Sequence, residues 1–129
     1  MIFNALIGNH DAHAKNFSIL YQQQRGTLAP LYDLLCTAAY PTLTDKMAMK
    51  VGSKYRFAEV QVRHWEQLAK AAGLSGAQTK KRVAAIAKQL PSCARRLQTD
   101  ALYSDQPLVE RIILLIEQRC TLTLERLNT

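Results

Sequence analysis

The stretch GNHDAHAKNF at residues 8–17 ends an apolar run and replaces it with a cluster of polar side chains. Positions 9–16 hold two asparagines, two histidines, an aspartate and a lysine. Ordinary loops are built mainly from Gly, Pro, Ser, Asn and Asp, whereas this set adds groups that can handle protons, metal ions and phosphate. Binding and catalytic residues concentrate on loops that a rigid scaffold positions. We therefore predict a functional loop between two buried elements.

The spacing between Asp11 and Asn16 matches the catalytic loop of protein kinases, in which four residues separate an aspartate from an asparagine. In such a loop the aspartate faces the attacking hydroxyl and accepts its proton. The asparagine supplies an amide oxygen to Mg²⁺, which prefers oxygen ligands. A second carboxylate is needed for the metal ion. Asp33 follows at the expected place, one hairpin later in the chain.

Two longer motifs extend this match. They are LIGN at 6–9 running into DAHAKNFS at 11–18, and LAPLYDLL at 28–35. Together they resemble the C-terminal part of the HipA-like serine/threonine kinases, the toxins of HipA–HipB toxin–antitoxin pairs. MAMKVG at 47–52 and RHW at 63–65 continue the likeness, which weakens after about Gly73.

The resemblance implies a role for each residue of the motif. Asp11 would be the catalytic base, while Asn16 and Asp33 would bind Mg²⁺ and, through it, the nucleotide. His13 stands where many protein-serine kinases place a lysine that contacts the γ-phosphate, so it either donates to phosphate or braces the loop. Lys15 is a further candidate for contact with phosphate or with an acidic group.

The resemblance also implies cofactors and partners. ATP and Mg²⁺ would be bound by the full-length enzyme, a HipB-like DNA-binding antitoxin would be its partner, and some family members act on aminoacyl-tRNA synthetases. Only seven residues precede Gly8, and the chain has neither a glycine-rich loop nor a paired strand lysine and helix glutamate. We therefore expect the distal part of a larger kinase, inactive without its N-terminal lobe.

The composition of the chain is typical of one compact domain. It has 129 residues, of which 48% are hydrophobic and 21% charged. No apolar run approaches the roughly 20 residues that cross a bilayer, and no signal-peptide pattern is present at the N-terminus, so we predict a cytoplasmic protein without membrane contact. The cysteines at positions 36, 93 and 120 lack a paired spacing and are expected to be buried or partly buried free thiols.

The net charge of +7 and the pI near 9.6 allow two interpretations. The basic residues gather at 54–56, 80–82 and 95–96, and such clusters are commonly solvated helix faces. They could instead contact nucleic acid or an acidic protein, because cations gain affinity by releasing phosphate counterions. Aromatic residues do not alternate with these clusters, which weakens any case for base stacking.

The apolar periodicity predicts a mainly helical fold with one short β-hairpin. A kinase C-lobe requires such a fold, but a generic helical domain would show the same periodicity. We expect the end of a helix at 1–7, a strand at 17–21 with a turn at 24–27, a helical turn at 32–37, and an irregular loop at 38–46 that contacts the protein substrate. One amphipathic helix should cover Phe57 to Ala72 and end at Gly73, a second should run from Gly76 to Leu90 and end at Pro91, and a third should begin with Asp105 as its N-cap.

We interpret residues 1–129 as a single kinase lobe, in which 1–52 carry the catalytic and metal-binding loops and 53–129 form a helical bundle. Two other functions remain open from the residues alone. One is a regulatory or docking fragment that keeps the scaffold without catalysis. The other is a basic helical module that binds nucleic acid.

Overall fold

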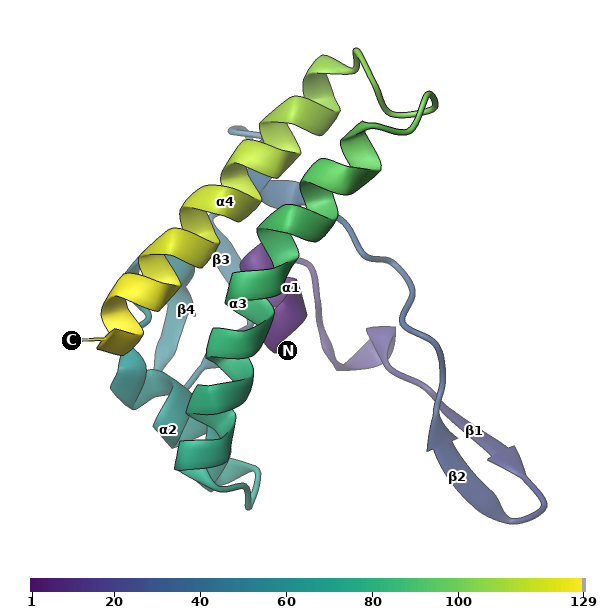
Figure 1. The fold of residues 1–129 in the computed structure, drawn as a ribbon. Coiled ribbons are helices and arrows are strands. Elements are labelled where there is room, and N and C mark those ends of the chain that lie inside the picture. Colours follow the sequence, from purple (N-terminus) through teal and green to yellow (C-terminus); the bar gives the residue numbers. More distant parts are fainter. Residues whose placement is uncertain (129) are drawn as a thin grey trace.

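The computed structural model describes residues 1–128 and shows a mainly helical protein with two small two-stranded sheets (Figure 1). The helices are α1 (Ile2–Ile7), α2 (Val62–Ala71), α3 (Gly76–Gln98) and α4 (Pro107–Asn128); the strands are β1 (Ile19–Gln22), β2 (Arg25–Leu28), β3 (Lys46–Val51) and β4 (Lys54–Arg56); and the short 3₁₀ turns are η1 (Ala14–Asn16), η2 (Thr37–Ala39) and η3 (Phe57–Glu59). The predicted fold class is confirmed. No helix within residues 1–128 is long and apolar enough to cross a membrane.

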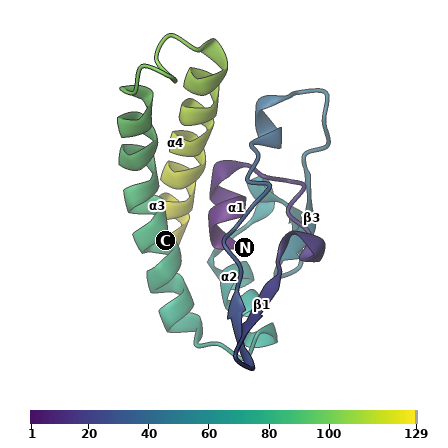
Figure 2. The same cartoon turned by 90° about the vertical axis from the view of Figure 1, so that its right-hand side faces the viewer.

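The two long helices, α3 and α4, lie side by side and form one layer of the molecule (Figures 1 and 2). The short helix α1 lies between this layer and the β3–β4 hairpin (Figure 2). Leu6, Val51, Val83 and Cys120 come from four different elements and are almost completely buried. A single apolar core therefore joins the helix that leads into the candidate loop to the rest of the protein.

Helix α1 ends at Gly8, as predicted. Gly8 is in the left-handed conformation, with φ at 78°, and its backbone N–H donates to the Asn4 carbonyl. A Cβ atom at this position would lie 2.8 Å from the Cβ of Ala38. Both the backbone conformation and the close packing of the 36–38 segment favour glycine here.

The predicted strand before the first turn is present, but the turn lies elsewhere. Strands β1 and β2 pair from Ile19 with Leu28 to Gln22 with Arg25, so Gln23 and Gln24 form the turn. Both glutamines have positive φ angles, of 47° and 66°, as a two-residue hairpin turn requires. The prediction of a turn at 24–27 was wrong because Gly26 was read as a turn glycine. Instead Gly26 lies opposite Tyr21, and the Tyr21 ring covers it.

A second hairpin, formed by β3 and β4, was not predicted. Its turn contains Gly52, whose φ is 59° and whose missing side chain leaves room for the His64 carbonyl. Met47 and Val51 point into the core and give β3 a partly alternating burial pattern. The alternation spans only a few residues and was not assigned to a strand.

Helix α2 is shorter than the predicted helix over 57–72. Phe57 belongs to η3 and Val60 is extended, so the helix begins at Val62, although both side chains are buried as expected. The ring Nδ1 of His64 accepts a hydrogen bond from the Gln61 N–H at 2.8 Å and so caps the helix. The helix ends just before Gly73, as predicted, and Trp65 is part of the core.

Helix α3 continues through Pro91 to Gln98, so the prediction that it ends at Pro91 was wrong. Proline removes one backbone donor and usually breaks a helix, but apolar packing on both sides of Pro91 keeps α3 continuous: Ala87, Leu90 and Ala94 all contact the core. Helix α4 begins at Pro107. Asp105 has a φ of 60° and lies two residues earlier, so it is not the N-cap.

The segment after Asp33 is extended, where a helical turn over 32–37 was predicted. Asp33 itself has a φ of 55°, which interrupts a right-handed helix, and the first turn begins only at Thr37. The expected loop at 38–46 is present apart from that turn and from Lys46, which starts β3.

The three cysteines are free thiols, as predicted, but their burial differs. Cys120 is buried and Cys36 is half-buried, whereas Cys93 is exposed on α3. Burial raises the pKa of the Cys120 thiol to about 11 and also raises the pKa of Cys36. Both thiols therefore stay protonated at neutral pH.

Candidate functional site

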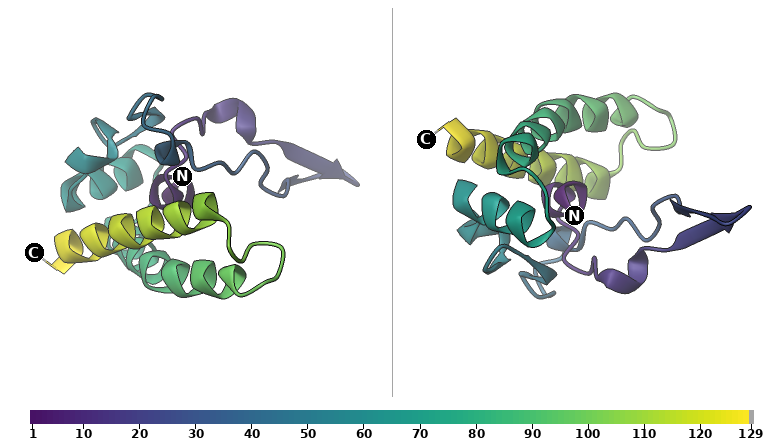
Figure 3. Two further views of the ribbon diagram at one scale, coloured as in Figure 1. Left: turned by 90° about the horizontal axis from the view of Figure 1, so that it is seen from above. Right: turned by 90° about the horizontal axis from the view of Figure 1, so that it is seen from below.

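The β1–β2 hairpin projects away from the helical body (Figures 1 and 3), and the predicted site lies where this arm joins it. Asp11 is three residues beyond Gly8, the C-cap of α1, and its side chain is exposed. Its backbone N–H donates to the Oδ1 of Asn9 at 3.2 Å. The backbone of the candidate base is thus fixed by a neighbour while its carboxylate faces solvent.

Asn16 and Asp33 are in direct contact although 17 residues separate them in the sequence. The Asn16 Nδ2 donates to the Asp33 Oδ2 at 2.9 Å, and the Asn16 Oδ1 accepts the His13 N–H at 3.0 Å. The η1 turn holds Asn16 close to the arm, and β1–β2 returns the chain to bring Asp33 beside it. The hairpin therefore joins the two predicted metal ligands.

Asp33 is held at its backbone as well as at its carboxylate. Its carbonyl accepts a hydrogen bond from the Asn9 Nδ2 at 3.1 Å. Because Asn9 also binds the Asp11 N–H, one continuous set of hydrogen bonds links Asp11, Asn9, Asp33 and Asn16. The structure thus brings together the three predicted residues, and Asn9, to which the sequence assigned no role, connects them.

The other two candidates differ in their surroundings. His13 is half-buried, and its Nδ1 is buried without a hydrogen-bond partner among residues 1–128. The Lys15 side chain is exposed, while its carbonyl accepts the Tyr32 hydroxyl at 2.9 Å. Tyr32, which belongs to the LAPLYDLL motif but was assigned no role, therefore connects the segment before Asp33 to the η1 turn.

The donor atoms at this site fit Mg²⁺. A carboxylate and an amide oxygen are hard ligands, and Mg²⁺ commonly takes one or two protein ligands and fills its shell with water and substrate phosphates. Asn16 touches Asp33 through its Nδ2, which is not a metal ligand, so its Oδ1, which accepts the His13 N–H, would be the amide ligand beside the Asp33 carboxylate. Within the described chain, no three His, Cys, Asp or Glu side chains gather at a place that could hold a metal ion.

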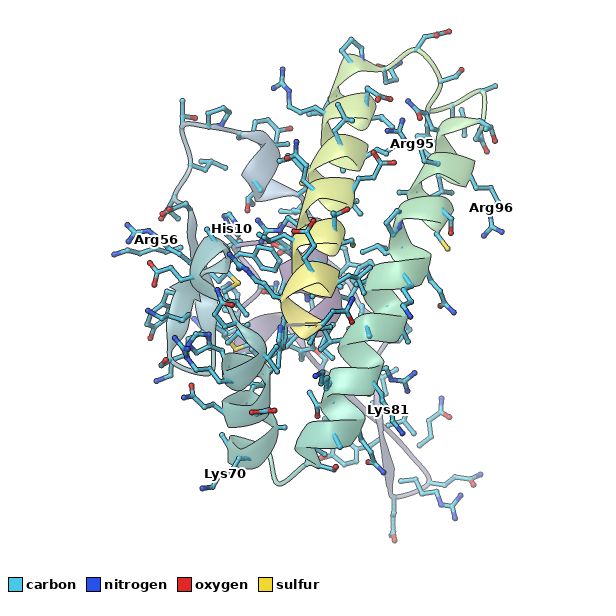
Figure 4. The ribbon with its side chains drawn as sticks, turned by 60° about the vertical axis from the view of Figure 1, so that its left-hand side comes forward. His10, Arg56, Lys70, Lys81, Arg95 and Arg96 are labelled. Carbon is cyan, nitrogen blue, oxygen red and sulfur yellow. The ribbon has the colours of Figure 1, made fainter. Side chains whose placement is uncertain are left out.

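His10 anchors the loop from the inside and is placed within the body in Figure 4. The His10 side chain is buried, and its ring Nδ1 contacts the Thr44 carbonyl at 3.0 Å. The His10 backbone makes two further hydrogen bonds. Its N–H donates to the Thr37 hydroxyl at 2.9 Å, and its carbonyl accepts the Ala48 N–H at 2.7 Å. Burial lowers the pKa of the His10 imidazole, so the ring is neutral at pH 7. His10 thus ties the Asp11 loop to the segment after Asp33.

Arg119 of α4 contacts α1, the helix that leads into the Asp11 loop, and the η3 turn. Its Nε donates to the Ala5 carbonyl at 2.9 Å, and its guanidinium lies 3.8 Å from the centre of the Phe57 ring. Burial lowers the pKa of Arg119 to about 10, so the group stays charged at neutral pH. A cation–π contact and a backbone carbonyl compensate this buried charge in place of a carboxylate.

The family model for the HipA-like C-terminal domain matches residues 1–95. The chain belongs to this family. This match extends well beyond Gly73, where the sequence motifs become weak. The matched residues include α1, the candidate loop, both hairpins, α2 and most of α3.

Two relatives from Sinorhizobium fredii match this HipA-like domain. The protein named "Putative kinase Y4mE" is 43% identical over 106 residues, which are 81% of this chain and 25% of that protein. The protein named "Putative kinase Y4dM" is 37% identical over 76 residues, or 58% of this chain and 19% of that protein. The chain thus spans about a quarter or less of the length of these relatives.

A solved structure shows the same fold. The chain aligns over 98% of its length with 30% of a chain from the Shewanella oneidensis MR-1 complex of HipA, HipB and operator DNA. The TM-score is 0.85 and the sequence identity is 21%. This likeness extends the agreement in fold across α3 and α4, beyond the residues that the family model matches.

Proposed function

We propose that this chain supplies the catalytic base and the metal ligands of a HipA-like serine/threonine protein kinase. Asp11 orients the hydroxyl of a protein serine or threonine and accepts its proton, while Asn16 and Asp33 hold Mg²⁺. Bound Mg²⁺ would neutralise charge on the phosphates of ATP. The observation that carries this proposal is the hydrogen-bonded set that joins Asp11, Asn9, Asp33 and Asn16.

His13 and Lys15 complete the proposed nucleotide side of the site. Both lie in the same loop, and the exposed Lys15 ammonium can reach an anionic group in solvent. His13 donates its backbone N–H to Asn16, so it braces the metal ligand whatever its ring contacts. In this proposal ATP also needs a clamping lobe, which lies in the part of the longer relatives that the chain does not match.

Membership of the family supports a wider setting for the full-length protein. We propose a toxin that a HipB-like DNA-binding antitoxin controls, with a protein substrate such as an aminoacyl-tRNA synthetase. The solved relative is a HipA in complex with HipB and operator DNA. Co-purification of the full-length protein with the product of an adjacent antitoxin gene would test the partnership.

The kinase proposal is tested by phosphate transfer from labelled ATP. The full-length protein should phosphorylate a protein serine or threonine, and Asp11→Asn should reduce the rate by about 10²–10⁴-fold, the usual contribution of a positioned base. Residues 1–129 alone should transfer no phosphate. Equal rates for the full-length protein and its Asp11→Asn variant would refute the assignment of Asp11 as the base. Transfer by residues 1–129 that Asp11→Asn abolishes would instead refute the need for a clamping lobe.

One observation favours a second activity, contact with a nucleic-acid backbone. Helix α3 contains no Asp or Glu across its 23 residues. Its cations are Lys80, Lys81, Arg82, Lys88, Arg95 and Arg96, and among residues 1–128 only Arg95 has a carboxylate partner. In Figure 4, Lys81 and Arg96 point outward from α3, whereas Arg95 turns toward α4.

Duplex binding measured by fluorescence anisotropy would test this activity. Neutralising phosphate contacts gives an affinity that falls steeply with salt. A Lys81→Glu, Lys88→Glu, Arg96→Glu variant should lose binding and salt dependence together. The control Lys50→Glu changes an exposed charge on β3, outside α3, and should bind nearly as tightly as the unchanged protein. Absence of duplex binding at low salt would exclude the activity.

A further inference from the structure

Asn9 is one of the few buried polar side chains of the protein, with 4% of its surface exposed. Both of its amide N–H groups donate, one to the Asn4 Oδ1 at 3.0 Å and one to the Asp33 carbonyl at 3.1 Å. Its Oδ1 accepts the Asp11 N–H. A buried amide with both donors and an acceptor position in use is fixed in orientation.

The side chain of Asn9 is not needed to end α1. The backbone N–H groups of Gly8 and Asn9 both donate to the Asn4 carbonyl, and they close the helix without any side chain. Two of the three side-chain hydrogen bonds of Asn9 instead join the backbone of the site, one at the Asp33 carbonyl and one at the Asp11 N–H. The Asn9 amide therefore acts on the site and not only on the helix end.

Asp33 needs such a hold. Its φ of 55° places it in the left-handed region, which is unfavourable for a residue with a side chain. The apolar side chains around it contribute little burial, since Leu31, Tyr32, Leu34 and Leu35 are each more than 40% exposed. Polar contacts therefore hold Asp33, with Asn9 on its carbonyl and Asn16 on its carboxylate.

We propose that Asn9 is a positioning residue, which sets the distance between the base Asp11 and the metal ligand Asp33. This proposal rests on the kinase function given above and deepens it. Asn9 touches neither metal nor substrate. It fixes the backbone of both acidic residues from a buried position, so that the carboxylates keep one relative arrangement.

The chain offers a matched control in Asn4. Asn4→Ala removes the buried partner of Asn9 but leaves the bonds to Asp11 and Asp33 in place. Asn9→Ala removes all three. Both variants delete a buried hydrogen bond in the same spot, so both should lower the urea midpoint of unfolding, while only Asn9→Ala should change the metal site.

The experiment measures Mn²⁺, a substitute for Mg²⁺, in the full-length protein with ATP, by electron paramagnetic resonance. Residues behind a metal ligand typically contribute about 10–100-fold to metal affinity or activity, so Asn9→Ala should raise the Mn²⁺ half-saturation by about that factor and lower kcat. Asn4→Ala should stay within about 3-fold of the unchanged protein. A double variant with Asn16→Ala should show less than the product of the single effects, because both asparagines act on Asp33.

Two results would overturn the inference. One is unchanged Mn²⁺ binding and kcat in Asn9→Ala. The other is an equal loss in Asn4→Ala and Asn9→Ala at matched stability, which would assign Asn9 to folding alone. The kinase function is judged separately: if Asp11→Asn and Asp33→Asn leave transfer intact, that function is wrong, while the Mn²⁺ titration still decides whether Asn9 acts on the site.

Discussion

The helical body and the exposed arm are stabilised by different forces. In the body, α1, α3, α4 and β3 bury apolar side chains against one another, and Leu6 and Val83 are fully buried. In the arm, every residue of β1 and β2 is exposed, and the site is fixed by hydrogen bonds between side chains and backbone. Apolar burial can therefore change without moving the site, and the site can change without unfolding the body.

The largest expected effect separates activity from stability at Asp33. Asp33→Gly should reduce phosphate transfer by the full-length protein at least about 10³-fold, since it removes a metal ligand. Glycine adopts a φ of 55° without strain, so the free energy of unfolding should stay within about 1 kcal/mol of the original. Transfer assays and urea unfolding of the same preparation check both halves. A large loss of unfolding free energy would show that Asp33 stabilises the fold, and the proposed separation between the body and the site would then be wrong.

The next effect is on stability and not on the metal site. Leu6→Ala empties a fully buried position between α1 and the long helices and should lower the free energy of unfolding by about 3–5 kcal/mol. Where the variant is still folded, its Mn²⁺ half-saturation should match that of the original protein. Urea unfolding followed by circular dichroism measures the first quantity. A variant with original stability would mean that α1 is not part of the core.

A smaller effect concerns pH and His64. Burial lowers the pKa of this imidazole, with further lowering from the charges of Arg63 and Lys54. The unfolded chain therefore binds a proton more readily, and the stability present above the ordinary pKa of about 6.5 is lost as the pH falls through the lowered value. His64→Gln, which keeps an acceptor for the Gln61 N–H, should lose less stability between pH 7.5 and pH 5.5. Urea titrations of both proteins at the two pH values measure this difference. An equal loss of unfolding free energy between pH 7.5 and pH 5.5 in His64→Gln and the original protein would contradict the prediction.

The smallest effect is expected on the arm. Tyr21 is 77% exposed, so Tyr21→Ser should change the free energy of unfolding by less than about 0.5 kcal/mol. Thermal unfolding of the isolated domain is a sufficient measurement. A loss of unfolding free energy as large as that of Leu6→Ala would show that the β1–β2 hairpin stabilises the helical body. The separation between body and arm would then be wrong.

The sequence predicted most of what depends on local chemistry. Gly8 ended α1 as expected, the 3.6-residue period located Trp65 in the core, and the hairpin before Asp33 was expected. These features follow from backbone preference and from which side chains are apolar, and both can be read from neighbouring residues.

The features that were missed have two causes. Packing against the core keeps α3 continuous through Pro91, whereas the Gln23–Gln24 turn follows from the pairing of β1 with β2, which places Gly26 in a strand. Within the site, the spacing of Asp11 and Asn16 indicated the loop, but the contact of Asn9 with Asp33 crosses 24 residues and is invisible to any local pattern. The presence of Asn9 inside the motif was the only available signal.

The hydrogen bond from Arg119 to the Ala5 carbonyl spans 114 residues and connects the last helix to the first. On the ribosome, the helix that leads into Asp11 must wait for α4 to emerge before this contact can form. The candidate site of a nascent chain would therefore lack this support until α4 has emerged. Nascent chains stalled before and after α4 and compared for protease resistance at residues 1–10 would show whether this delay exists.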